Sequence, residues 1–206
     1  MSQSSEAPEP VRSRLGLNPR LDRVVFVGAL GVLSAVSPMA TDMYLASMPE
    51  MSQWFDTTAS MVQLSLTAYM VGMAIGQFVL GPLSDVLGRH KLMVAGTALF
   101  LLSSVVIIFT TDIRVVLALR FVQGVAGAAG VVIARAVVSD IARGHRAAQL
   151  YSVLSLITSL APVVAPLAGG VIATVADWRV VFWVLTCFGV VMLACSVLSL
   201  IHISEP

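Results

Sequence analysis

Charged residues are scarce in this sequence: they make up 11% of its 206 residues, whereas roughly a quarter of an average soluble domain is charged. Hydrophobic residues make up 58%. A soluble fold of this length has no interior large enough to bury so much apolar surface. The composition therefore excludes a water-soluble globular protein and predicts one that spans a lipid bilayer.

Patterns that carry chemistry are missing as well. The sequence has no glycine-rich phosphate loop of the ATP-binding type and no nucleophile–base or metal-ligand set, so we expect neither an enzyme nor a cofactor or metal site. It has no basic stripe with interleaved aromatic residues, so nucleic acid is not an expected partner. Its two cysteines, Cys187 and Cys195, share one apolar stretch, where cysteine usually acts as a small hydrophobic residue.

Six apolar runs are each long enough to cross a bilayer, whose hydrocarbon core takes about twenty helical residues. Because backbone N–H and C=O groups cannot stay unpaired in lipid, these runs predict α-helices. The predicted spans are residues 24–48, 60–80, 92–109, 115–138, 148–173 and 180–201. The predicted fold class is an all-α membrane protein with six transmembrane helices, in one bundle at residues 23–201.

Polar segments flank this bundle on both sides. Residues 1–22 are rich in Ser, Pro and Glu and are predicted to form a disordered cytoplasmic tail. Residues 202–206 carry no basic anchor. We expect this second segment to be a truncated tail or an artefact of a mis-joined reading frame.

Lys and Arg are distributed unevenly between the two sides of the predicted bundle. Nine of the twelve lie on one side: four in the tail, two in the turn at 81–91 and three between residues 135 and 146. Loops with an excess of Lys and Arg stay in the cytoplasm. We therefore expect a multi-pass protein of the cell (inner) membrane, with both termini and the turns at 81–91 and 139–147 in the cytoplasm.

The turn at 81–91 carries a motif that resembles the loop between helices 2 and 3 of the major facilitator superfamily, where it acts as a gating loop. The matching positions are Gly81, Asp85, Gly88 and Arg89. Val86 departs from the motif, which usually has a basic residue at this position. Asp85 and Arg89 are four residues apart and can pair on one helical face; a plain solvated turn is the alternative.

Three further stretches resemble the same superfamily. Residues 41–44 with Pro49 are similar to its Bcr/CflA-type drug:proton antiporters, and residues 120–124 resemble the helix 4 motif of proton-coupled members. A third stretch resembles the helix 5 antiporter motif, with Ala165 where glycine is commoner. Its matching positions are Pro162, Pro166, Gly169 and Gly170. For this stretch, a purely structural kink is the alternative to a gating role.

The resemblance implies the N-terminal six-helix half of a secondary transporter. Such a protein exports small hydrophobic or cationic compounds, as in multidrug efflux, in exchange for protons. Family members have twelve helices in two halves, so a C-terminal six-helix half is an expected partner, beside protons and the lipid bilayer. Two alternatives remain open: proton-coupled transport of one specific metabolite, and a non-transporting truncated fragment or helix-binding module.

Asp42 and Arg120, both inside predicted spans, are the candidate proton-coupling residues. A carboxylate at the bilayer centre costs about 2.5 to 3.5 kcal/mol, so Asp42 is expected to have a function there. At 1.5 Å per residue both side chains lie roughly 8 to 9 Å below the outer helix ends, and we expect them to meet across one cavity. The alternatives are that Asp42 is an outer helix cap and that Arg120 extends to the outer surface.

Other polar and flexible side chains in the spans are candidates for lining a substrate cavity, although ordinary helix packing is the alternative for each. These candidates are Tyr44, Tyr69, Met73, Gln77 and Gln123. Gln123 follows Arg120 by three positions and is expected to share its helical face. Small residues at helical spacing predict close helix contacts. They are Gly72, Gly76, Gly124, Gly127 and Gly130.

Overall fold

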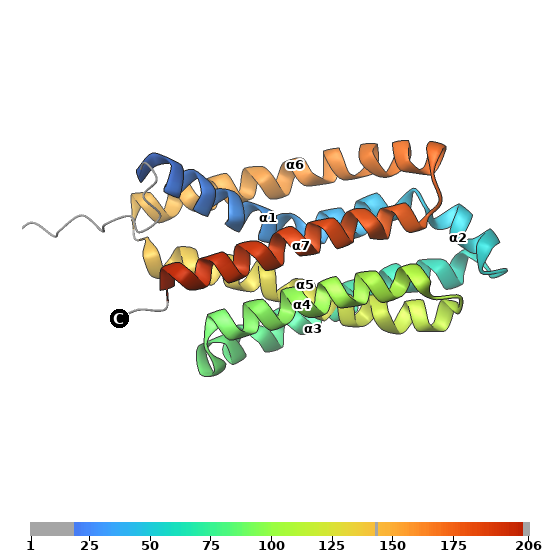
Figure 1. Ribbon diagram of the computed structural model, residues 1–206, viewed down its shortest axis with the longest axis horizontal. Coiled ribbons are helices and arrows are strands. Elements are labelled where there is room, and N and C mark those ends of the chain that lie inside the picture. The colour runs from blue at the N-terminus through green and yellow to red at the C-terminus, as the bar shows by residue number, and fades with distance from the viewer. Residues whose placement is uncertain (1–18, 143, 204–206) are drawn as a thin grey trace, which may run out of the picture.

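The computed structural model describes residues 19–142 and 144–203, which form seven α-helices lying mostly side by side along one long axis (Figure 1). The helices are α1 (Pro19–Leu45), α2 (Met48–Trp54), α3 (Ala59–Leu87), α4 (Arg89–Phe109), α5 (Ile113–Ile141), α6 (His145–Val175) and α7 (Arg179–Ile203). Most of the predicted tail, residues 1–18, and most of the predicted end segment, residues 204–206, lie outside the described residues. The predicted all-α architecture is confirmed.

Five of the helices, α3 to α7, are each long and apolar enough to cross a membrane. A sixth span is obtained if the pair Val27–Leu45 and Met48–Trp54, bent by 61°, is counted as one. The bend coincides with Pro49 at the start of α2, where a residue without an N–H is tolerated but continuation of a straight helix is not. The short helix α2 thus lies mostly in the segment between the first two predicted spans, 24–48 and 60–80, where no helix was predicted.

The expected turn at 81–91 is also shorter than predicted. Helix α3 continues through Pro82 to Leu87, and α4 begins at Arg89, so Gly88 alone connects the two helices. Gly88 has φ +89°, a conformation that residues with a Cβ rarely adopt. The polar residues before it extend the helix beyond the apolar run, which is why hydrophobicity alone placed the helix end too early.

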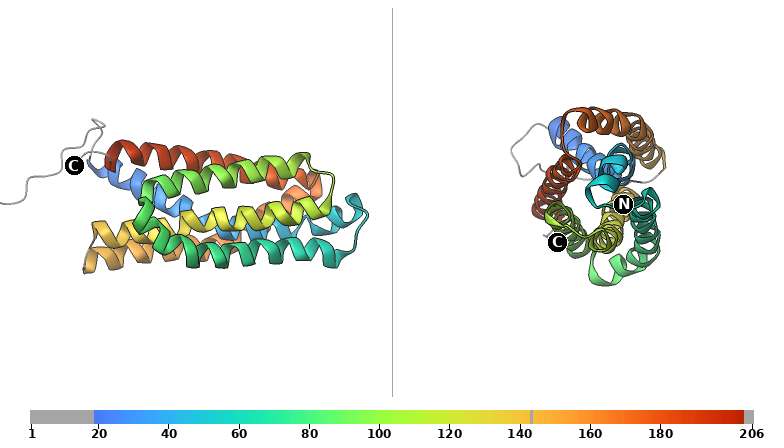
Figure 2. Two further views of the ribbon diagram at one scale, coloured as in Figure 1. Left: turned by 90° about the horizontal axis from the view of Figure 1, so that it is seen from below. Right: turned by 90° about the vertical axis from the view of Figure 1, so that its right-hand side faces the viewer.

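The helices form two groups, which meet where α1 packs on α5 and where α4 packs on α7. In Figure 1, α6, α1 and α7 lie above α5, α4 and α3, and the end-on view in Figure 2 shows α7 beside α4. Helix α3 packs chiefly on α5, α5 also packs on α4, and α1 packs on α6 and α5. These contacts bring α1, α3, α5 and α6 around a common interior, although they are far apart in sequence.

Glycines permit the close approach of α3 and α5. A Cβ at Gly72 would overlap the backbone carbonyl of Phe121, and a Cβ at Gly124 would overlap the carbonyl of Tyr69. Lipid provides no hydrophobic force between helices, so such close packing holds them together. The predicted role of these glycines in helix contact is confirmed.

Candidate functional site

Arg120 lies on α5 in the interior of the bundle, and its side chain is fully buried. Its guanidinium donates one hydrogen bond from Nη1 to Oε1 of Gln123 (2.7 Å) and one from Nη2 to the carbonyl of Ala40 on α1 (2.9 Å). Gln123 donates in turn from Nε2 to Oγ of Ser104 on α4 (2.6 Å). A chain of buried hydrogen bonds through Arg120 thus joins α1, α4 and α5.

Three aromatic rings surround the Arg120 guanidinium, and we call them the aromatic cage. The Arg120 Cζ lies 4.4 Å from the ring centroid of Tyr44, 4.5 Å from that of Tyr69 and 5.9 Å from that of Phe182. The Tyr44 hydroxyl is itself held by Oγ of Ser65 at 2.5 Å. A cation over an aromatic face gains about 2 kcal/mol when both are removed from water, so the cage compensates part of the cost of burying the charge.

Asp42 does not pair with this arginine. It lies three residues before the end of α1, is partly exposed, and its Oδ1 is 3.1 Å from the Thr41 hydroxyl. Ala40, which is buried beside Arg120, is two positions away, and two positions turn a helix by about 200°. Within the described part of the chain, the expected meeting of Asp42 and Arg120 is therefore not observed, and the ion pairs present there involve other residues.

The five predicted cavity residues separate into three groups. Tyr44 and Tyr69 belong to the aromatic cage, and Gln123 holds the Arg120 guanidinium. Met73 is buried on α3, where its backbone N lies close to Gly124 of α5. Gln77, one turn further along α3, is exposed and lines a different space.

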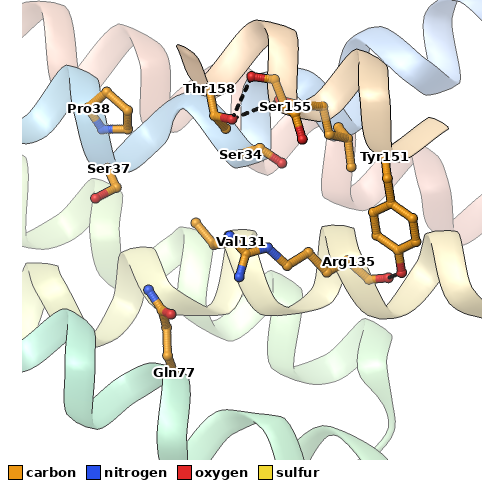
Figure 3. Close-up of a pocket in the computed structure, with 10 residues that line it drawn as sticks. Ser34, Ser37, Pro38, Gln77, Val131, Arg135, Tyr151, Ser155 and Thr158 are labelled. Atoms are coloured by element: carbon orange, nitrogen blue, oxygen red, sulfur yellow. Dashed lines mark hydrogen bonds between the residues drawn. The ribbon is translucent and has the colours of Figure 1, made fainter. Parts of the chain in front are cut away.

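That space is a polar pocket of about 240 Å³ between α1, α3, α5 and α6 (Figure 3). Its lining consists of Ser34, Ser37, Pro38, Gln77, Val131, Arg135, Tyr151, Leu154, Ser155 and Thr158. Sequence reasoning anticipated only Gln77 as a cavity residue; it counted Arg135 among the basic residues of the cytoplasmic side and matched it to the Bcr/CflA-type branch without giving it a role. A usable signal was present: Ser34 with Ser37, and Ser155 with Thr158, each place two hydroxyls three positions apart on an otherwise apolar helix.

The motif at the junction of α3 and α4 forms a charged cluster with α5. Arg89 hydrogen-bonds Asp140 of α5 through Nη1, and its Nη2 lies 3.5 Å from Oδ1 of Asp85. The Asp85–Arg89 pairing follows from their spacing, whereas the contact with Asp140, fifty-one positions from Arg89, comes from the packing of α4 and α5. The remaining motif residues shape the backbone: Gly81 accepts a hydrogen bond from the Ser84 hydroxyl, and Gly88 makes the turn.

The helix 5 motif lies within α6, which runs through both of its prolines. Pro162 and Pro166 are exposed, whereas Ala161 and Ala165 are buried. One turn further on, a Cβ at Gly169 would overlap the Met43 carbonyl, so this small-residue face packs on α1. Gly170 has open space around it.

Together these features define a class: a multi-pass membrane protein with a buried cation and a polar pocket inside a bundle of apolar helices. The chain belongs to the major facilitator superfamily, a family of transporters whose model matches residues 30–206.

Three relatives place the chain within that family. It is 40% identical over 181 residues to the uncharacterized MFS-type transporter YdgK of Bacillus subtilis, an alignment that covers 87% of this chain and 45% of the relative. It is 34% identical over 178 residues to a bicyclomycin resistance protein homolog of Haemophilus influenzae, with 86% and 45% covered. It is also 34% identical over 154 residues to a chloramphenicol resistance protein of Pseudomonas aeruginosa, with 74% and 37% covered.

These relatives confirm the resemblance to the Bcr/CflA branch that the motifs indicated. The chain spans less than half the length of each of the three, 45% of the first two and 37% of the third.

Proposed function

We propose that this chain works in the export of small hydrophobic or cationic compounds in exchange for protons, together with helices equivalent to the part of its relatives that it does not cover. The observation that carries the proposal is Arg120, a cation held inside an aromatic cage in a bilayer-spanning bundle. An ionisable group within the membrane is costly and is retained where it serves a transport pathway. Two relatives named for resistance to bicyclomycin and chloramphenicol support export of such drugs.

We assign the proton to Asp42, the only carboxylate within the six predicted spans. Its partial exposure near the end of α1 gives water access to the carboxylate, whereas Arg120 is fully buried. Both residues are attached to α1, Asp42 covalently and Arg120 through the Ala40 carbonyl. A movement of α1 during transport would therefore change the surroundings of both charges at once.

We further propose the cytoplasmic membrane as its location, with the α3–α4 junction and the α5–α6 connection facing the cytoplasm. The uneven distribution of Lys and Arg supports this orientation. Both termini then face the cytoplasm as well, because an even number of spans separates them.

The test is proton-driven chloramphenicol transport in proteoliposomes containing the chain and, as a second polypeptide, the part of the Bacillus subtilis relative that it does not cover. Wild-type protein is expected to take up the drug when a pH gradient is imposed, and the chain alone is not. Asp42→Asn should abolish gradient-driven uptake, because it cannot exchange a proton. Asp112→Asn, an exposed carboxylate that caps α5, is the matched control and should transport normally. Gradient-driven uptake by Asp42→Asn at the wild-type rate would place the coupling site elsewhere.

A second function, proton-coupled transport of one specific metabolite, is favoured by the polar pocket. Hydroxyl, amide and guanidinium groups line it, and fixed polar groups of this kind give a site its specificity. A panel of drugs unrelated in structure separates the two functions, since a specific transporter would leave the resistance of cells to most of them unchanged.

A further inference from the structure

The polar pocket is too small to hold a whole drug-sized molecule. Ligand sites usually measure about 300 to 1,000 Å³, whereas this pocket measures about 240 Å³. Helices α1, α3, α5 and α6 form its walls (Figure 3). Its size suits one polar end group of a substrate, with the rest of the molecule extending beyond these four helices.

Arg135 is the one charged side chain among the described residues that line the pocket. Figure 3 shows its side chain extending along the pocket toward Val131. The nearest carboxylate on the same helix, Asp140, is bound by Arg89. Arg135 is exposed. Among the side chains that the structure describes, at residues 27–140, 142, 144–145 and 147–197, none forms an ion pair or a hydrogen bond with its guanidinium, so its positive charge faces the pocket without an anion from these residues.

A neighbouring side chain holds the backbone at Arg135, and two of the lining hydroxyls are engaged within their own helices. The Tyr151 hydroxyl donates to the backbone carbonyl of Arg135 (3.1 Å), which ties α6 to α5 at this point. The hydroxyls of Ser34 and Thr158 donate to carbonyls of their own helices, 2.9 Å and 3.0 Å away. Gln77 contributes an amide, which has two N–H donors. Ser37 and Ser155 add hydroxyls to the lining, so the Arg135 guanidinium is its charged donor and the Gln77 amide is a second, neutral one.

We propose that the pocket binds an anionic oxygen group of the transported compound, a carboxylate in particular, and that Arg135 is its direct ligand with Gln77 as a second donor. A planar guanidinium binds a carboxylate through two parallel N–H···O hydrogen bonds. The inference rests on the proposed transport function and changes its substrate class in one respect: at this pocket a cationic group is repelled by Arg135 and finds no carboxylate among the described lining residues. Substrates with an acidic end group are thus preferred over cationic ones.

The experiment measures binding of radiolabelled benzoate to the purified chain in nanodiscs of phosphatidylcholine, with benzamide and benzylammonium as neutral and cationic competitors of similar size. Benzoate is expected to bind about tenfold more tightly than benzamide, since its hydrogen bonds to Arg135 are charge-assisted. Benzylammonium should not compete. Equal affinity for benzoate and benzamide in wild-type protein would overturn the proposal without recourse to any variant.

Variants show which residue of the pocket binds benzoate. Arg135→Gln should reduce benzoate binding to the level of benzamide, and Arg135→Lys should retain part of it, whereas Arg114→Gln at the other end of α5 is the matched control and should bind as wild type. A lipid phosphate is the other source of an anionic oxygen group. If phosphatidylglycerol nanodiscs show Arg135-dependent lipid retention by native mass spectrometry, while benzoate has no advantage in phosphatidylcholine, the pocket is a lipid site and the substrate assignment is wrong.

Failure here is distinguishable from failure of the proposed function. Absence of a benzoate preference, with proton-driven chloramphenicol transport intact, refutes only the carboxylate site. Loss of drug transport in the assembled protein, with Arg135-dependent benzoate binding intact, refutes the drug-export proposal and leaves the site.

Discussion

Arg120 shows how a single charge is accommodated inside a membrane bundle without a carboxylate in the described part of the chain. Two hydrogen bonds, to Gln123 and to the Ala40 carbonyl, and the aromatic cage replace the water that the guanidinium loses. Such compensation is incomplete, since Nε has no partner among the described atoms. Replacing a buried ion with an apolar residue of similar size is often neutral or stabilising. The arginine is thus better explained by function than by stability.

This explanation predicts opposite effects of two substitutions at position 120. Arg120→Met should keep or raise the melting temperature of the purified chain, whereas Arg120→Lys should lower its stability by about 2 kcal/mol, because a compact ammonium cannot make both hydrogen bonds. Both should abolish drug transport in the assembled protein. Thermal unfolding followed by circular dichroism gives the first comparison, and proteoliposome flux gives the second. A melting temperature that falls equally in both variants would make Arg120 a structural residue.

At the scale of helices, the contact between α3 and α5 depends on glycines, which have no side chain. Helices α3 and α5 approach so closely that Gly72 and Gly124 each face a backbone carbonyl of the other helix. The aromatic cage depends on this contact, because Tyr69 of α3 and Arg120 of α5 lie on either side of it. Helix α6 also packs closely on α1 at a glycine, Gly169. Packing of these helices therefore sets the geometry of the site.

A pair of glycine substitutions tests this dependence. Gly124→Ala places a methyl group against the Tyr69 carbonyl and should destabilise the chain by about 1 to 3 kcal/mol, the usual cost of overpacking. Gly170→Ala, also within a helix but with open space around it, should be neutral or stabilising by up to about 1 kcal/mol. Unfolding in detergent provides the measurement. Equal stability of the two variants would show that the α3–α5 contact is looser than described.

The whole molecule exposes apolar side chains on each of the helices α3 to α7, as expected for a bundle that borders lipid or further helices. On α3 and α6 the large apolar side chains with exposed faces include Leu64, Met70, Phe78, Leu156, Leu160 and Leu167. The ends of the bundle differ: Arg89 and Asp140 lie at one end, and α2 lies at the other (Figure 1). The orientation of these ends in the membrane is open to direct measurement.

Cysteine accessibility provides this measurement in a background in which Cys187 and Cys195 are replaced by alanine. A cysteine at Gln53, exposed on α2, should react with an impermeant maleimide added to intact cells. A cysteine at Leu87, exposed at the α3–α4 junction, should react only after the membrane is permeabilised. The reverse pattern would invert the proposed topology. Cells expressing the cysteine-free chain serve as the control for background labelling.

Local features of the sequence determined much of the fold. Long apolar runs predict spans because an α-helix pairs its backbone N–H and C=O groups within the same segment, so no other segment is needed to satisfy them in lipid. Four of the predicted motifs also fall at helix ends or in helix contacts, as with Gly169 against α1. Helix ends were less accurate, since α3 continues past its apolar run to Leu87 and α2 follows the bend near Pro49.

The composition of the site, in contrast, was decided by tertiary structure. Sequence positions gave Asp42 and Arg120 similar depths, but a helix presents each residue in a different direction, and the rotation of α1 in the bundle brought the Ala40 carbonyl to the arginine. The polar pocket likewise exists only where four helices meet, so Arg135 acquired its surroundings from residues distant in the chain. Apolar runs and charge counts are properties of one segment, whereas these contacts depend on how the segments pack against one another.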